Sequence, residues 1–133
     1  MDRQLTDKKQ DGGIRQSGSI IAKELQVLGL AVRARRVALG SDAALLSISR
    51  GAAHLVYLAS DAGDNAAKKF RDKCAFYQIP IVTSFTRAEL GRACGRSQLV
   101  VAAVTDPGFA AELAHDAAGD ISGGVLFDKT SRV

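Results

Sequence analysis

The sequence predicts a single-domain α/β protein, folded as a three-layer α/β/α sandwich. Segments with helical and with extended patterns alternate between residues 19 and 118, and this alternation is typical of helices that cover both faces of a sheet. Apolar residues form 47% of the 133 residues but aromatic residues only 5%, so we expect a core of Val, Leu, Ile and Ala. A chain of this length is long enough to bury such a core.

The chain is expected to begin with a tail, a helix and a short strand. Residues 1–18 are mostly polar and contain several glycines, and we interpret them as a flexible tail. From Ser19 to Ala31 the apolar residues recur at helical spacing and predict the first helix. Arg35–Leu39 is then expected to form a short strand that ends at Gly40.

Ser41 and Gly51 delimit a predicted second helix. The Ser41 side chain would cap the helix at its start, and Gly51 would end it. The residues expected to face inward are Ala44, Leu45 and Ile48. His54–Ala59 follows as an apolar run rich in β-formers, which predicts a buried strand.

A third helix is expected after this strand. Asp61 and Asp64 offer caps for its start. The side chains predicted to share its inner face are Phe70, Cys74 and Tyr77. Its outer face is basic, which we interpret as a solubilising surface made by Lys68, Lys69, Arg71 and Lys73. The next expected strand is Pro80–Phe85.

The C-terminal part is expected to contribute two more helices around a strand. Thr86 and Glu89 have the spacing of a capping box, which predicts the start of a fourth helix that Gly95 breaks. Leu99–Val104 is the most hydrophobic predicted strand. Asp106 and Pro107, a cap followed by proline at the first helical position, then begin a fifth helix. We interpret residues 119–133 as a flexible C-terminal tail.

No catalytic or metal-binding signature is present in the sequence. It lacks the glycine-rich loops that hold nucleotide phosphates and the G-x-S-x-G nucleophile turn. Neither His54 nor His115 has a neighbouring nucleophile. Cys74 and Cys94 lack the spacing of metal or redox pairs, and we interpret them as small buried hydrophobic residues. The protein is therefore expected to be no enzyme and to need no cofactor or metal.

The apolar stretches also bear on where the protein resides. The run Leu99–Val104 is far too short to cross a bilayer. The N-terminus carries three aspartates and lacks the apolar core of a secretory signal. We therefore expect a cytoplasmic protein without a membrane partner.

Positive charge is concentrated just before Gly40. Lys and Arg outnumber Asp and Glu by only 18 to 14 over the whole chain. Residues 33–50, however, contain four arginines and a single acidic residue. Three of these arginines fall within four positions: Arg33, Arg35 and Arg36. Such a cluster next to a glycine turn favours a polyanionic partner over a merely solvated face.

The turn Gly40–Asp42 is the strongest candidate for function. A helix N-terminus presents unpaired N–H groups and a partial positive charge, which attract phosphate or base acceptors. Glycine allows another backbone to approach closely, and Arg35 and Arg36 come from the segment before it. The alternative interpretation is that Ser41 is only a helix cap.

Six stretches, in unbroken order over about residues 20–117, resemble a known family. They are Leu28–Arg36, Leu39–Asp42, Leu58–Asp61, Asp72–Tyr77, Leu90–Gly95 and Val100–Phe109. Together they resemble the bacterial YlxQ type of the ribosomal L-seven-Ae/L-thirty-e superfamily. The most specific segments are Asp72–Cys74 and Val104–Ala110. The resemblance implies an α/β/α sandwich around a four-stranded mixed sheet.

The resemblance also implies binding to kink-turn RNA, a sharply bent duplex with tandem sheared G·A pairs that is recognised by its shape. In that family the glycine turn and the start of the second helix enter the groove, and a loop before the last strand packs on the other side. Here these regions are Gly40–Leu46 and Gly95–Gln98. We therefore expect a monomer whose partner is RNA, either a kink-turn or ribosomal RNA, with the ribosome as a candidate assembly. The residues expected to bind RNA are Arg33, Arg35, Arg36, Gly40, Ser41, Asp42, Leu46, Gly95, Arg96, Ser97 and Gln98.

The base-reading positions depart from the superfamily pattern. After the glycine that pattern is x-Asn-Glu-x-x-Lys, with the Glu and the Lys reading guanine, and this chain has Asp42, Ala43 and Leu46 at the three named positions. Asp42 agrees with the YlxQ type. Each lost bidentate contact with a base costs about 1–3 kcal/mol, so we expect weaker kink-turn binding or a different RNA. The alternative is a protein-interaction module on the same fold, favoured by the apolar patch that Leu46 would form beside Ala43.

Overall fold

The structure, a computed structural model, describes residues 14–120 and confirms the α/β/α sandwich around a four-stranded mixed sheet. The strand order is β2-β5-β3-β4. The strands are β2 (Val37–Leu39), β3 (Leu55–Leu58), β4 (Ile81–Val82) and β5 (Val101–Val104). β5 pairs antiparallel with both β2 and β3, and β3 pairs parallel with β4. β2 is therefore an edge strand.

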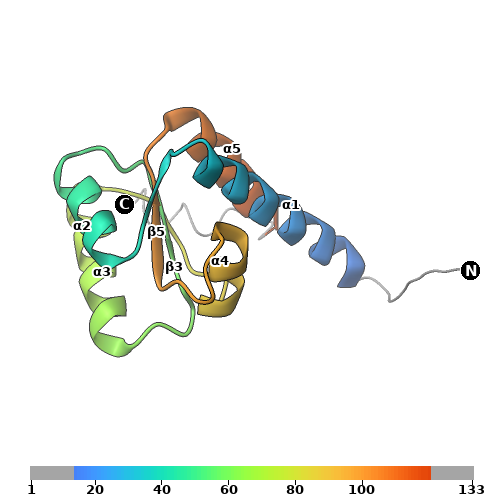
Figure 1. Cartoon of the computed structure of the whole chain (residues 1–133), viewed down its shortest axis with the longest axis horizontal. Helices are drawn as coiled ribbons and strands as arrows, with labels where there is room; N and C mark the ends of the chain where they lie inside the picture. The colour runs from blue at the N-terminus through green and yellow to red at the C-terminus, as the bar shows by residue number, and fades with distance from the viewer. Residues whose placement is uncertain (1–13, 121–133) are drawn as a thin grey trace, which may run out of the picture.

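Five helices cover the two faces of this sheet (Figure 1). One face carries α1 (Ile14–Arg33), α4 (Arg87–Cys94) and α5 (Pro107–Asp120), and the other carries α2 (Ser41–Ser49) and α3 (Asp64–Tyr77). In β3, Leu55 and Tyr57 pack against the first group of helices and Val56 and Leu58 against the second, because successive side chains of a strand point to opposite faces. Burial on both faces explains why this strand reads as a continuous apolar run.

The two ends of the described chain are more helical than expected. α1 begins at Ile14 rather than Ser19, so residues 14–18, assigned above to the tail, belong to this helix. α5 continues to Asp120. The rest of the two predicted tails, residues 1–13 and 121–133, lies outside the described residues.

The strands are shorter than predicted. The expected strand Arg35–Leu39 is reduced to Val37–Leu39 because Arg35 has a left-handed backbone conformation, with φ 62°, in the turn after α1. The expected Pro80–Phe85 strand is reduced to Ile81–Val82. Hydrophobicity located the centres of these two strands but not their ends.

Asp61 and Asp64 do not cap α3, contrary to the prediction. The N-cap of α3 is Gly63, and no side chain caps this helix. Asp61 instead accepts a hydrogen bond of 2.8 Å from the backbone N–H of Arg87, which lowers the pKa of the Asp61 carboxyl. The Nε atom of Arg87 lies 3.6 Å from the same carboxylate. Asp61 thereby joins the segment after β3 to the start of α4.

The caps predicted for α4 and α5 are confirmed. Thr86 and Glu89 form a capping box, in which the Thr86 side chain accepts from the Glu89 N–H and the Glu89 carboxylate accepts from the Thr86 N–H. At α5 the Asp106 carboxylate accepts a hydrogen bond of 2.9 Å from the Phe109 N–H. Both caps depend on residues three positions apart, which is why the sequence alone located them.

The two cysteines are free and buried, as predicted. Cys94 lies in the core beneath α1, α4 and α5, and Cys74 in the core beneath α2 and α3. Burial raises the pKa of Cys74 to about 12 and that of Cys94 to about 11. Because the thiolate is the nucleophilic form, neither thiol is activated at neutral pH.

Candidate nucleic-acid interface

The start of α2 has no side-chain cap. Its N-cap is Gly40, with φ 92° and ψ 167°, and Ser41 is the first helical residue rather than the cap that the sequence suggested. The first backbone bond of the helix runs from the Ala44 N–H to the Gly40 carbonyl oxygen, at 2.9 Å. The preceding N–H groups, of Ser41, Asp42 and Ala43, therefore point out of the helix end without a capping side chain. The interpretation of Ser41 as a helix cap is wrong.

The Gly40 turn and the loop Gly95–Gln98 lie at the same end of the sheet. The Gly40 N–H donates to the carbonyl oxygen of Val101, the first residue of β5, at 3.0 Å. Val101 follows Gln98 by three positions. One hydrogen bond between an edge strand and its neighbour thus brings together two regions that are distant in the sequence.

The loop Gly95–Gln98 folds tightly against α4. Gly95 is the C-cap of α4, with φ 81°, and the Arg96 N–H donates to the Gly91 carbonyl oxygen at 2.7 Å. A Cβ atom at Gly91 would lie 2.7 Å from the Cα of Gln98 and 2.8 Å from the carbonyl oxygen of Arg96. Only glycine therefore fits at position 91 while the loop keeps this path. The steric role of Gly91 was not predicted, because a glycine within a helical sequence pattern does not reveal which distant residues pack against it.

The side chains at this end of the sheet are accessible. Ser41, Asp42 and Ala43 are exposed, and all four residues of the loop Gly95–Gln98 are exposed. Leu46, one turn further along α2, is 51% exposed although it is a large apolar residue. We call the combined surface of Gly40–Leu46 and Gly95–Gln98 the turn–loop surface.

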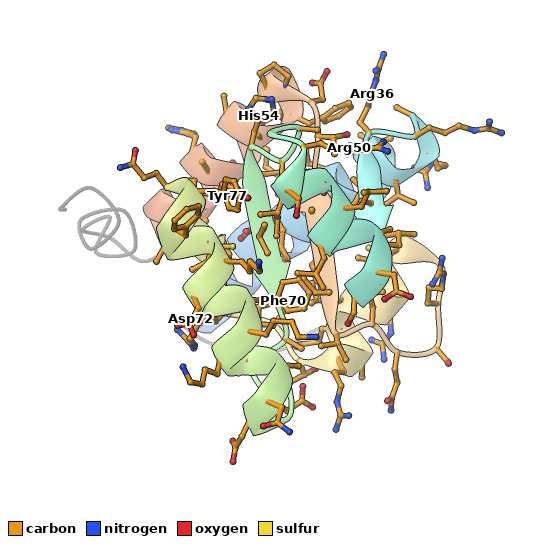
Figure 2. The ribbon with its side chains drawn as sticks, turned by 90° about the vertical axis from the view of Figure 1, so that its left-hand side faces the viewer. Arg36, Arg50, His54, Phe70, Asp72 and Tyr77 are labelled. Atoms are coloured by element: carbon orange, nitrogen blue, oxygen red, sulfur yellow. The ribbon has the colours of Figure 1, made fainter. Side chains whose placement is uncertain are left out.

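Arg35 and Arg36 lie at the opposite end of β2 from Gly40. The carbonyl oxygen of Arg36 accepts a hydrogen bond of 2.8 Å from the N–H of Thr105, which follows the last residue of β5. Figure 2 shows Arg36 at the same end of the molecule as Arg50 and His54. Arg35 and Arg36 are therefore close to the Gly40 turn in the sequence but not in space, because the whole length of β2 separates them from it.

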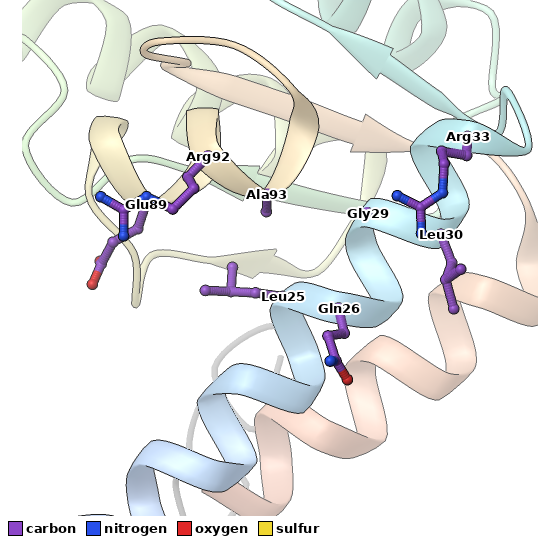
Figure 3. A pocket seen from close by; sticks show the side chains of 8 residues that line it. All are labelled: Leu25, Gln26, Gly29, Leu30, Arg33, Glu89, Arg92 and Ala93. Carbon is purple, nitrogen blue, oxygen red and sulfur yellow. The ribbon is translucent and has the colours of Figure 1, made fainter. Parts of the chain in front are cut away.

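Arg33 lies neither at the Gly40 turn nor beside Arg36, but lines a hollow between α1 and α4 (Figure 3). This hollow has a volume of about 650 Å³ and two arginines, Arg33 and Arg92, in its lining. The two helices approach closely beside it, because a Cβ atom at Gly29 would lie 3.0 Å from the carbonyl oxygen of Ala93. The three arginines of the sequence cluster thus do not converge on the Gly40 turn.

Among residues 14–120 no group of three or more His, Cys, Asp or Glu side chains is arranged to hold a metal ion. His54 and His115, the two histidines, are both exposed. Within the same part of the chain, no helix has the length and apolar character needed to span a membrane.

The fold and the turn–loop surface define a small α/β/α-sandwich protein in which an uncapped helix start and a helix-anchored loop meet at one end of a mixed sheet. The chain belongs to the Ribosomal protein L7Ae/L30e/S12e/Gadd45 family, whose model matches residues 22–114. The resemblance found in the sequence is confirmed.

Two curated relatives are similar over most of their length. The RNA-binding protein YlxQ of Bacillus subtilis (strain 168) is 48% identical over 87 residues, which cover 65% of this chain and 87% of that protein. The RNA-binding protein YlxQ of Enterococcus faecium is 34% identical over 88 residues, which cover 66% of this chain and 84% of that protein.

Solved structures share the fold. A protein of unknown function from Bacillus halodurans C superimposes with a TM-score of 0.69 at 44% identity, covering 71% of this chain and 96% of that one. The Giardia lamblia 15.5kD RNA binding protein superimposes with a TM-score of 0.64 at 24% identity, covering 77% of this chain and 90% of that one. At that identity the second match demonstrates the fold alone.

Proposed function

We propose that this protein is a non-catalytic RNA-binding protein that recognises kink-turn-like or ribosomal RNA through the turn–loop surface. The observation that carries the proposal is the convergence of the uncapped start of α2 with the loop Gly95–Gln98, through the Gly40–Val101 hydrogen bond of 3.0 Å. The names of the two YlxQ relatives, both RNA-binding proteins, support the choice of RNA as ligand.

The chemistry of the turn suits an acceptor-rich ligand. The backbone N–H groups of Ser41, Asp42 and Ala43 are donors at the positive end of the α2 dipole, so phosphate oxygens or base-edge acceptors bind there. Because Gly40 has no side chain, an RNA strand is able to approach the backbone closely. Arg96 and Gln98 supply further exposed donors from the opposite side of the turn–loop surface.

Arg35 and Arg36 would then contact RNA beyond the turn rather than inside it. They lie four to five residues from Gly40, at the far end of β2, a separation of roughly 13–16 Å at 3.3 Å per residue. An RNA strand that runs along this edge of the sheet would place phosphates near both arginines. We assign them the role of adding affinity, with a corresponding dependence on salt.

The specificity of the turn–loop surface is expected to be weak. The side chain of Ala43 offers no polar atom to a guanine edge, and Leu46 supplies no cation. The backbone donors of the turn remain, but they distinguish shape and charge rather than base identity. We therefore propose affinity for bent or irregular RNA with only modest preference for tandem G·A pairs.

A second candidate function is a protein-interaction module with RNA binding weakened or lost. The observation that favours it is Leu46, which is 51% exposed on α2 beside the exposed Ala43. An apolar side chain in this position is unsuited to a phosphate and suited to another apolar surface.

An electrophoretic shift assay separates these functions. The wild-type protein is titrated against a kink-turn RNA and against the same RNA without its G·A pairs, each at low and at high salt. Tighter binding to the intact kink-turn supports the proposal. Equal, salt-sensitive binding to both rules out kink-turn recognition and leaves nonspecific RNA binding, while no shift at low salt favours the protein-interaction module.

A further inference from the structure

Two aromatic side chains at the C-terminal end of α3 are exposed. Phe76 is 77% exposed, more than any other large apolar residue of the described chain, and Tyr77 is 39% exposed. Their rings contact each other edge to face, with centroids 4.9 Å apart and planes at 80°. Tyr77 was predicted to lie on the inner face of the third helix together with Phe70 and Cys74. Of these three residues only Phe70 and Cys74 are buried, so the prediction for Tyr77 is wrong.

Two lysines share this surface with the rings. Lys69, Lys73 and Phe76 follow one another at helical spacings of four and three residues, which places them along one stripe of α3. With Asp72 and Tyr77 they line a shallow hollow of about 440 Å³. Figure 2 shows Asp72 and Tyr77 along this helix. We call Lys69, Lys73, Phe76 and Tyr77 the α3 stripe.

The positive charge of the α3 stripe is not neutralised within residues 14–120. The only carboxylate that lines the hollow, that of Asp72, is bound by Lys68 at 2.8 Å. Neither Lys69 nor Lys73 has an ion-pair partner in this part of the chain. The hollow therefore combines two exposed rings with two unpaired cations.

We propose that the α3 stripe binds single-stranded RNA, with a base stacked on Phe76 and the adjoining phosphates held by Lys69 and Lys73. Aromatic rings that stack on bases beside lysines that hold the backbone are the usual means of binding single strands without sequence preference. The inference rests on the proposed function for the nature of the ligand, RNA, but it adds a site that is separate from the turn–loop surface.

RNA fits this surface better than a protein does. The other exposed large apolar residues, Leu30 and Leu46, lie on α1 and α2, so α3 offers little more than two rings. A stable protein interface buries about 800 Å² on each partner and has few charges at its centre. The rings of the α3 stripe are instead flanked by cations, which complement a polyanion.

The test uses a dye-labelled single-stranded oligonucleotide and a matched oligonucleotide of the same length whose nucleotides are abasic. Both carry the same phosphates, so only the first is able to stack. Fluorescence anisotropy at low salt gives the affinity of the full-length protein for each. We expect Phe76→Ala to weaken binding of the first by about tenfold and to leave binding of the abasic strand unchanged. Lys73→Gln is expected to weaken both.

Control variants separate stacking from other effects. Leu30→Ala removes an exposed apolar side chain from α1 and should change neither affinity. Phe76→Leu keeps an apolar side chain without the ring, and should lose most of the affinity that Phe76→Ala loses. If Phe76→Leu binds as well as the wild type, a ring is not required and the proposal is wrong. Because Phe76 is largely exposed, Phe76→Ala and Phe76→Leu should both keep the melting temperature of the wild type.

A kink-turn RNA without single-stranded ends distinguishes this inference from the proposed function. Phe76→Ala should bind this RNA as the wild type does. If the wild type binds the kink-turn RNA but shows no Phe76-dependent binding of the single strand, the inference alone fails. If it binds the single strand through Phe76 but not the kink-turn RNA, the turn–loop surface alone fails.

Discussion

The phenolic hydroxyl of Tyr57 donates a hydrogen bond of 2.6 Å to the Glu24 carboxylate in the core between the sheet and α1. Tyr57 is fully buried on β3, and Glu24 is 1% exposed on α1. A buried carboxylate is costly unless hydrogen bonds satisfy its oxygens. This bond therefore fixes the position of α1, the long helix at the N-terminal end of the described chain, against the sheet.

Tyr57→Phe should lower the free energy of unfolding by about 1–3 kcal/mol, because it removes a hydrogen bond to a buried carboxylate while keeping the ring that stacks on Phe85. Urea unfolding followed by circular dichroism measures the change. Tyr77→Phe is the matched control, since it removes the hydroxyl of the partly exposed tyrosine and should change stability by less than about 0.5 kcal/mol. If the two substitutions lower the free energy of unfolding equally, the hydrogen bond from Tyr57 to Glu24 does not stabilise the fold.

The buried hydroxyl of Tyr57 is also expected to make the protein less stable at alkaline pH. Burial, and then the charge of Glu24, raise the pKa of Tyr57 in the folded protein far above its ordinary value of about 10. The folded state therefore keeps a proton that the unfolded chain releases, so the stabilisation is complete below pH 10 and declines as the pH rises above it.

Between pH 10 and 12 the wild type should lose up to about 1.4 kcal/mol per pH unit more than Tyr57→Phe does. The high pKa values of Cys74 and Cys94 add to the alkaline loss in both proteins and cancel in the comparison. Urea unfolding at a series of pH values measures both slopes. Parallel curves for the two proteins would mean that Tyr57 ionises in the folded state.

Gly91→Ala should displace the loop Gly95–Gln98, because the new Cβ atom would lie 2.7 Å from the Cα of Gln98. We expect a stability loss of about 1–3 kcal/mol from overpacking and a weaker interaction with RNA at the turn–loop surface. The control is Gly63→Ala, where the added Cβ atom would have no neighbour within 4 Å beyond the adjoining residues, so that only the smaller cost of alanine at the N-cap of α3 is expected. RNA affinity is measured by gel shift at a temperature at which both variants are folded. If the Gly91→Ala protein is destabilised but binds RNA with the affinity of the wild type, the loop Gly95–Gln98 does not contact the RNA.

Much of the fold was predictable because its signals are local. The centres of the four strands are apolar runs, and the caps at Thr86 and Asp106 each depend on partners three residues away. The role of Asp61 could not be predicted from local signals. Its sequence position favours a cap for the next helix, but its hydrogen-bond partner, Arg87, is 26 residues further along the chain.

The candidate site was predictable only in part, for the same reason. The Gly40 turn was proposed as a candidate site from its residues, and the loop Gly95–Gln98 only from the family resemblance. That the two lie at the same end of the sheet follows from the pairing of β2 with β5. Arg35 and Arg36 precede the turn in the sequence but lie across the length of β2 from it. The steric role of Gly91 and the bond between Glu24 and Tyr57 depend on side chains and loops that only the folded chain brings together.

Leu46→Lys tests whether α2 faces the RNA. Leu46 is 51% exposed, so a lysine is accommodated there without loss of packing, and its ammonium group would extend beside the uncapped helix start. If this position faces the groove, the variant should bind a kink-turn RNA about tenfold more tightly, and the slope of log affinity against log salt should steepen by about one. Leu30→Lys is the matched control, because it adds the same charge at a side chain 49% exposed on α1. An equal gain in both variants would indicate only a general electrostatic effect, and no gain at position 46 would mean that this side of α2 does not contact the RNA.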